Sequence, residues 1–263
     1  MAVIQDISFR AHPQPRVWNG PHLGQGAIWI YNCALKRIET PKTSWVTVYF
    51  YEEGDDLSKY AMERSKAMNS NPKLIYIIND DNSIGIFTPF RWDDVLPLDG
   101  VGCQKMIIDT VHNAVVQVFA SLGWSTQELI DAHQAVVEAG YIYDRWFRKP
   151  KSNKNRSKRA GVWVRMENDL CIISVRQIDY DDNIVRNVEA VTLLPDPHPL
   201  GVLVNAFKWL DNDTIMLESK KRRVSRDYFE TYEIQSCPAA PMELIPDPQS
   251  LTGYGQLTIT VKV

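Results

Sequence analysis

Short acidic clusters on predicted loops are the residues of this sequence best suited to bind a partner, and aromatic residues accompany three of the four. The clusters comprise Tyr49, Tyr51, Glu52, Glu53, Asp55 and Asp56; Asp80 and Asp81; Trp92, Asp93 and Asp94; and Asp179, Tyr180, Asp181 and Asp182. Carboxylates steer a basic protein toward a surface, and Trp and Tyr supply anchors that become buried there. Turns also collect Asp for backbone reasons, so a purely structural role stays open.

A second pattern could do metal-assisted chemistry. Glu218-Ser219-Lys220 stands at the end of a predicted strand, downstream of Pro195-Asp196. The pattern resembles metal-dependent nucleases of the restriction-endonuclease-like class, in which two carboxylates hold a divalent ion and a lysine stabilises charge at the phosphate. The resemblance covers these five residues, and Pro197 and Pro199 interrupt the strand that it requires. It implies an alternative function, a nuclease or nucleic-acid-binding accessory protein acting through Asp196, Glu218 and Lys220.

The stretch from Arg148 to Arg159 holds seven basic residues in twelve positions and no acid. With Lys220-Lys221-Arg222-Arg223 it could neutralise phosphates. Single-strand binding usually needs aromatic side chains among the charges, and residues 148–159 contain none. The Pro, Ser and Asn content instead favours a flexible linker or long loop over residues 148–160, which the acidic surface of the protein could also hold.

No complete catalytic or cofactor motif is present, and we predict no catalytic residue, cofactor or metal site. Gly24-Gln25-Gly26 precedes a predicted strand, which excludes a dinucleotide fingerprint. Gly100-Val101-Gly102 precedes a helix but lacks the phosphate-binding lysine, so it predicts a simple turn. Asp109 and His112 have the local spacing of an acid–base pair, yet their predicted helix face is an ordinary polar stripe. The five histidines show no metal-ligand spacing.

Composition points to a globular protein of two domains. The chain has 263 residues and a net charge of −3, and removing the seven positive charges of residues 148–159 leaves −10 on the other 251. Cys33, Cys103, Cys171 and Cys237 lie far apart, which indicates neither a disulfide framework nor a zinc site. Without a signal-peptide pattern or a long apolar window, we expect a cytoplasmic protein with no membrane partner.

The first domain, residues 1–147, is predicted to be α+β, with a mixed sheet covered by a helical hairpin. Strands are expected at 27–38, 45–51, 73–78 and 84–88, and helices at 55–68, 103–122 and from the capping box at Ser125–Glu128 to Gly140. The second domain, residues 161–263, is predicted to be mainly antiparallel β. Its strands are expected at 162–166, 170–178, 184–194, 214–219, 228–234 and 256–263, with 200–210 favouring a helix.

Together these features favour a non-enzymatic cytoplasmic protein that binds or inhibits a basic protein partner. A specific form of this hypothesis is an immunity protein that neutralises a basic nucleic-acid-cleaving toxin. Direct binding of nucleic acid is the less favoured interpretation.

Overall fold

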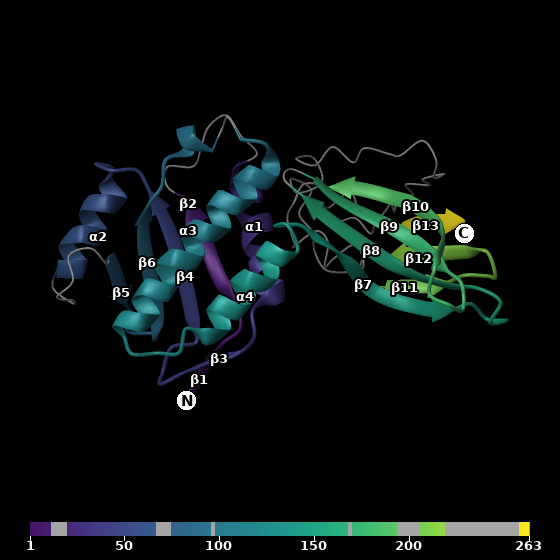
Figure 1. Cartoon of the computed structure of the whole chain (residues 1–263), viewed down its shortest axis with the longest axis horizontal. Coiled ribbons are helices and arrows are strands. Elements are labelled where there is room, and N and C mark those ends of the chain that lie inside the picture. The colour runs from purple at the N-terminus through teal and green to yellow at the C-terminus, as the bar shows by residue number, and fades with distance from the viewer. Residues whose placement is uncertain are drawn as a thin grey trace, which may run out of the picture. The chain divides into compact units, whose positions relative to one another are not determined.

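The chain forms two compact units, Met1–Ile142 and Tyr143–Val263, here called the N-terminal and C-terminal units (Figure 1). The computed structural model describes residues 1–11, 20–66, 75–95, 98–167, 170–193, 206–218 and 258–262. The N-terminal unit combines helices with a mixed sheet, and the C-terminal unit contains antiparallel sheets, which confirms the α+β class. The division falls before Tyr143, so residues 143–147 belong to a strand of the second unit rather than to the first.

The main sheet of the N-terminal unit has the order β2-β4-β6-β5. Strands β2 (Ile7–Ala11), β4 (Trp45–Tyr51) and β6 (Ser83–Pro89) run parallel, and β5 (Ile75–Ile78) pairs with β6 as an antiparallel hairpin. A small separate sheet joins β1 (Ala2–Ile4) to β3 (Ile38–Thr40). The strand predicted at 45–51 is therefore confirmed, and β5 and β6 confirm the strands predicted around 73–78 and 84–88.

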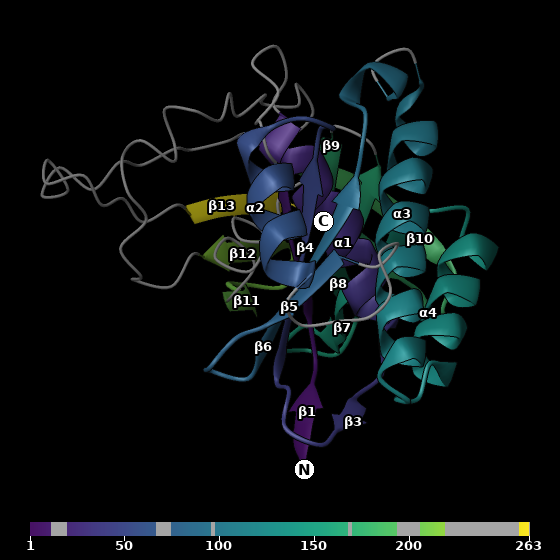
Figure 2. The same cartoon turned by 90° about the vertical axis from the view of Figure 1, so that its left-hand side faces the viewer.

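The two faces of this sheet carry different helices because side chains alternate along each strand. On one face, Ala61 of α2 (Asp56–Lys66) packs with Tyr51, Ile77 and Phe87. On the other face, Phe50 contacts Phe9, and α3 (Gly100–Ser121) crosses β4 and β6. Figure 2 shows α2 and α3 on opposite sides of the sheet.

The strand predicted at 27–38 is wrong, because residues 20–34 form helix α1 (Gly20–Ala34). A continuous apolar run has no period that separates a buried strand from a buried helix, and this run packs between β2, α3 and α4. Gly24 and Gly26 lie inside α1. A Cβ at Gly24 would stand 2.0 Å from the Phe9 ring, so the missing side chain allows the helix to approach β2.

The predicted helical hairpin is confirmed as α3 and α4 (Gln127–Glu138). Asp99 caps α3 by accepting the Gly102 N–H at 2.7 Å, and Gly123 ends the hairpin's first arm with φ +70°. The Ser125 hydroxyl donates to the Glu128 side chain at 2.7 Å, and the N-cap of α4 is Thr126, without a side-chain cap bond. The predicted capping box therefore located the start of the helix, but its reciprocal backbone bonds are not formed. While α3 contacts the sheet, α4 packs on α1 and α3. None of the described helices is long and apolar enough to cross a bilayer.

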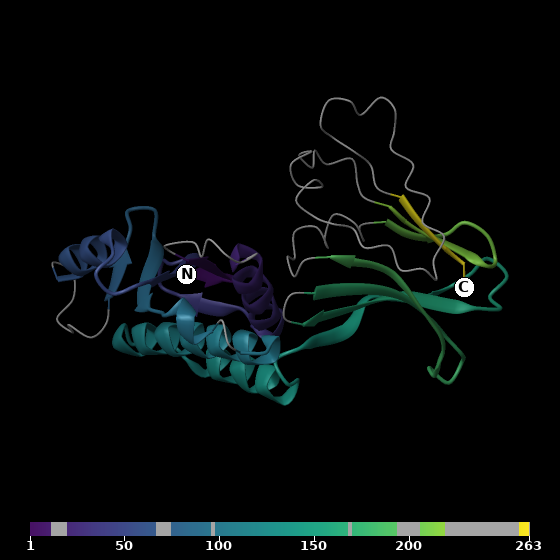
Figure 3. The same cartoon turned by 90° about the horizontal axis from the view of Figure 1, so that it is seen from above.

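The described residues of the C-terminal unit form two antiparallel sheets in two layers (Figure 3). The larger sheet has the order β10-β9-β8-β7 and the smaller one the order β11-β12-β13. Their bounds are β7 Tyr143–Ser152, β8 Arg159–Glu167, β9 Leu170–Ile178, β10 Ile184–Leu193, β11 Ala206–Trp209, β12 Thr214–Glu218 and β13 Thr258–Lys262. Residues 206–209 are a strand where a helix was favoured, and the predicted strand at 228–234 lies outside the described residues.

The prediction of a flexible linker at 148–160 is wrong. The basic run forms the end of β7, a turn and the start of β8, so its backbone is paired across the sheet. Asn153, only 3% exposed, accepts the Lys158 N–H and donates to the carbonyl of Asn212 in the β11–β12 turn, each at 3.1 Å. Lys158 pairs with Asp213 at 2.6 Å and Arg159 with Asp182 at 2.9 Å. Acidic residues thus hold two of the seven basic residues of this run.

Candidate functional site

A crevice lies where β4 and β6 end, because the chain leaves these neighbouring parallel strands toward opposite faces. After β4 the chain turns through Glu52 and Glu53 to α2, and after β6 it turns through the short helix η1 (Trp92–Asp94) to α3 on the other face. Such divergence opens a crevice at the carboxyl ends of parallel strands, where ligands commonly bind. The Phe90 N–H donates to the Tyr51 carbonyl at 2.9 Å. This bond keeps the two segments together one residue beyond the end of β6.

The crevice contains a hollow of about 720 Å³, within the size range of ligand sites. Its walls come from three places: Glu52 and Glu53 after β4, residues 89–94 after β6, and Met106 and Thr110 of α3. Two of the four predicted acidic clusters thus contribute to one site. Residues far apart in the sequence meet here because the strands that precede them are adjacent and parallel.

The hollow carries unbalanced negative charge. No hydrogen bond or ion pair of the Glu52, Glu53 or Asp93 carboxylate is formed with the part of the chain that the structure describes. Asp94 lies 3.9 Å from the Arg91 guanidinium, but both groups are largely exposed, so this pair is weak. Burial, followed by the charges of Glu53 and Asp55, raises the pKa of the Tyr51 phenol and keeps it neutral.

Trp92 contributes to the apolar part of the wall together with Pro89, Phe90 and Met106, and it is only 4% exposed. Its ring packs edge-on against Phe90 with centroids 4.9 Å apart, and Phe90 stacks on Phe50 at 4.1 Å. Among the described residues the Trp92 indole N–H has no acceptor.

The remaining predicted residues of the first cluster serve α2 and the sheet. Asp55 caps the helix, since its Oδ1 accepts the Ser58 N–H at 2.5 Å. Asp56 pairs with Lys59 at 3.4 Å on the helix surface. Tyr49 stacks on Phe87 with ring centroids 4.9 Å apart. None of these three is among the residues lining the hollow.

The other two acidic clusters lie elsewhere and shape turns. Asp80 and Asp81 stand in the β5–β6 turn, before the amino end of β6, and Asp81 accepts the Ser83 N–H at 2.9 Å. Asp179 accepts the backbone N–H groups of Asp181 and Asn183 between β9 and β10, at 2.9 and 2.8 Å. Asp182 pairs with Arg159, and Tyr180, 72% exposed, donates its hydroxyl to the Arg156 carbonyl.

The residues of the nuclease resemblance are only partly placed. Glu218 is the last residue of β12, while Asp196 and Lys220 lie outside the described residues, as does the basic run 220–223. Within the described ranges, His, Cys, Asp and Glu side chains form no group of three that could hold a metal ion.

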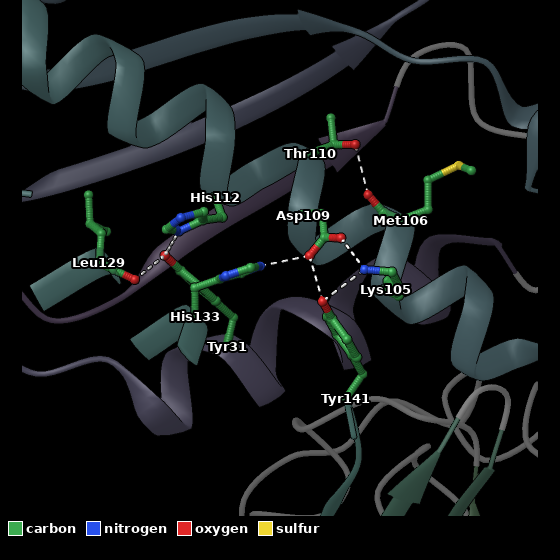
Figure 4. A network of polar contacts seen from close by, with 9 residues as sticks. All are labelled: Tyr31, Lys105, Met106, Asp109, Thr110, His112, Leu129, His133 and Tyr141. Atoms are coloured by element: carbon green, nitrogen blue, oxygen red, sulfur yellow. Dashed lines mark hydrogen bonds and ion pairs between the residues drawn. The ribbon is translucent and has the colours of Figure 1, made fainter. Parts of the chain in front are cut away.

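Sequence reasoning missed a polar network that joins α1, α3 and α4 (Figure 4). Asp109 bonds to His133 rather than to His112, with 2.7 Å between His133 Nε2 and Asp109 Oδ1. Tyr141 donates its hydroxyl to the same oxygen at 2.9 Å, and Lys105 donates to Oδ2 at 2.8 Å. His112 instead bonds through Nδ1 to the Tyr31 hydroxyl at 2.9 Å, and that hydroxyl lies 3.3 Å from the Leu129 carbonyl. The predicted helical hairpin places α3 beside α4, but distance from the turn does not identify the pair, since Asp109 lies 12 residues before the end of α3 and His133 lies 6 residues after the start of α4.

The members of the network bond to one another across the three helices. Burial, followed by the electrostatic effect of the neighbouring His133 ring, lowers the pKa of His112 to about 4, so the His112 imidazole is neutral at physiological pH. Burial tends to raise the pKa of Asp109, but the bonds from Lys105, His133 and Tyr141 outweigh it and leave the carboxylate ionised. Each of these groups is occupied by another member of the network.

Comparisons of this chain with family models, with curated proteins and with solved structures found no match.

Proposed function

We propose that this protein is a non-enzymatic binding protein that holds a basic segment of a partner protein in the crevice between β4 and β6. One observation carries the proposal: Glu52, Glu53, Asp93 and Asp94 line a hollow of about 720 Å³ that has a single basic lining residue among those described, Arg91, and Arg91 pairs only weakly with Asp94. A cationic side chain would balance these carboxylates. Such complementarity speeds association with basic partners and disfavours acidic ones.

The buried Trp92 N–H favours a peptide over a bare cation as the occupant. A metal ion or an isolated ammonium group accepts no hydrogen bond, whereas a peptide brings carbonyl acceptors together with its cationic side chains. Arg or Lys beside a main-chain carbonyl would therefore satisfy both the carboxylates and the indole donor.

In its most specific form, the proposal is that the protein is a cytoplasmic immunity protein that neutralises a basic nucleic-acid-cleaving toxin. A toxin of this class carries a basic surface for phosphate, and the crevice offers carboxylates that could occupy that surface. The formal charge of −10 outside residues 148–159 supports a preference for basic partners.

Calorimetric titration with a basic peptide, compared with an acidic peptide of equal length, tests the first level of the proposal. We expect salt-sensitive binding of the basic peptide alone, weakened at least tenfold in the E52Q/E53Q/D93N variant. The control variant D6N/E39Q/E63Q removes the same charge from other exposed sites of this unit. Failure of the basic peptide to bind at low salt, or equal weakening by the control, would overturn the proposal.

The immunity function is tested with the nuclease encoded beside this gene, where the neighbourhood contains one. The wild-type chain should abolish its phosphodiesterase activity, and E52Q/E53Q/D93N should restore it. Mg²⁺-dependent phosphodiesterase activity in the purified chain itself would instead support the alternative function through Asp196, Glu218 and Lys220.

A further inference from the structure

The larger sheet of the C-terminal unit has an outward face that carries two paired tryptophans. Along β8, Val162, Val164 and Met166 are fully buried, so the alternating residue Trp163 points to the opposite, outward face. Trp146 of β7 is the direct cross-strand partner of Trp163, and their rings meet edge to face with centroids 5.0 Å apart. Both rings are partly exposed.

Arginine extends this aromatic row onto the next strand. The Arg176 guanidinium of β9 lies 3.9 Å from the centre of the Trp163 ring, and its Nε donates to Asn187 of β10 at 3.0 Å. Asp144 accepts the Trp163 indole N–H, so the acid of this row is used to orient the ring. Three planar groups, Trp146, Trp163 and Arg176, thus follow one another across the sheet.

The backbone of β7 between Arg148 and Pro150 is displaced onto this same face. Two register shifts in β7, on either side of Arg148, displace the chain from regular pairing with β8. A Cβ at Gly161 would lie 2.9 Å from the Trp146 ring and 2.6 Å from the Arg148 carbonyl, so both occupy the outward side of Gly161. The absence of a side chain there gives room to the ring and the displaced backbone together.

Positive charge accompanies the aromatic row. Residues 143–160 contain eight Lys and Arg and one acid, Asp144. Lys158 and Arg159 are held by acidic residues, whereas exposed Lys149, Lys151 and Lys154 pair with no acid among the described residues. The aromatic side chains that residues 148–159 lack in sequence are therefore supplied by the fold, from Trp146 and Trp163.

We infer that this outward face binds single-stranded nucleic acid, independently of the crevice in the N-terminal unit. Bases stack on aromatic rings and on guanidinium planes, here Trp146, Trp163 and Arg176. Phosphates bind the exposed lysines along the edge strand β7 and in its turn, Lys149, Lys151 and Lys154. A duplex offers the phosphates but keeps its base faces stacked internally, so the geometry favours single strands.

Fluorescence anisotropy with a labelled oligothymidylate about 15 nucleotides long tests the inference, since this length spans a single-strand binding site. The matched probes are an abasic strand of equal length, which keeps the phosphates, and a duplex. We expect the base-bearing strand to bind at least roughly fivefold more tightly than the abasic one. Equal affinities would reduce the face to a basic patch and overturn the inference, as would the absence of binding at low salt.

Variants separate the two contributions. K149A/K151A/K154A should reduce the slope of log affinity against log salt concentration by about 2, at about 0.7 per lost phosphate contact. The control R37A/K42A/K59A, which removes equal charge from the other unit, should leave the slope unchanged. W146F keeps a smaller stacking ring and should bind more tightly than W146A. An unchanged slope in the first triple variant, or equal affinity of folded W146A and wild type, would contradict the assignment.

Discussion

The imidazole rings of His112 and His133 lie stacked, with centroids 4.1 Å apart and planes inclined by 14°, yet only His133 bonds to a carboxylate. His112, 9% exposed, faces the Tyr31 hydroxyl from α1, His133 from α4 and Asp109 one turn away on α3. Burial and the neighbouring imidazole disfavour the charged form of His112. The stacked pair therefore links the protonation state of His112 to the packing of α1, α3 and α4.

Acid should destabilise the N-terminal unit through His112. Its pKa is about 4 in the folded protein and 6.5 as the reference value, so between these values the unfolded chain binds more protons. The stabilisation is complete above pH 6.5 and falls as pH decreases toward 4, by up to about 3 kcal/mol. Urea unfolding at several pH values measures it. His112→Gln should flatten this part of the profile, and an unchanged profile would contradict the assignment.

Removing the Tyr31 hydroxyl should cost more than removing an exposed one. Tyr31→Phe leaves the His112 Nδ1 and the Leu129 carbonyl without their buried partner, a loss of about 1–3 kcal/mol in unfolding free energy. Tyr60→Phe breaks only an exposed bond to Arg64 and should change stability by less than about 0.5 kcal/mol. Equal effects of the two variants in denaturant titrations would argue against a buried network.

A methyl group at Gly24 should push α1 away from β2. Gly24→Ala places a Cβ 2.0 Å from the Phe9 ring, and we expect a loss of about 1–3 kcal/mol, the usual cost of overpacking. Phe9→Leu in the same chain should recover part of that loss by shortening the side chain in the way. Thermal unfolding of both variants measures these losses. If the loss from Phe9→Leu simply adds to the loss from Gly24→Ala, the close approach of Gly24 to the Phe9 ring is not what limits stability.

The tip of the β7–β8 hairpin should resist proteases as long as Asn153 holds it. Asn153→Ala removes bonds to Lys158, Ser157 and Asn212 from a site 3% exposed, and we expect a loss of about 1–3 kcal/mol. Limited proteolysis should then cut between residues 152 and 159 much faster than in wild type. Lys154→Ala serves as the exposed control. Rapid cutting of the wild-type protein here would contradict the ordered hairpin.

Local patterns predicted much of the fold. Strand 170–178 has the predicted bounds, and the turns at Asp179–Asn183 and Asp211–Asp213 join antiparallel strands as their Asp and Asn content indicates. Gly123 and the Ser125–Glu128 capping box located the helical hairpin. These signals work because they depend on backbone conformation within a few residues. The apolar run in α1 carries no such signal. Its packing against β2, α3 and α4 decided between helix and strand.

The amino-acid sequence by itself determined an α+β chain with acidic aromatic clusters, a basic segment and the turns that delimit its hairpins. Only the tertiary structure decided which charges meet. Parallel pairing of β4 with β6 brought Glu52 and Glu53 to the same hollow as Asp93, while the β7–β8 register set Trp146 against Trp163 beside the basic segment. These contacts join residues far apart in the chain, and strand order and register, which no short segment specifies, are what bring them together.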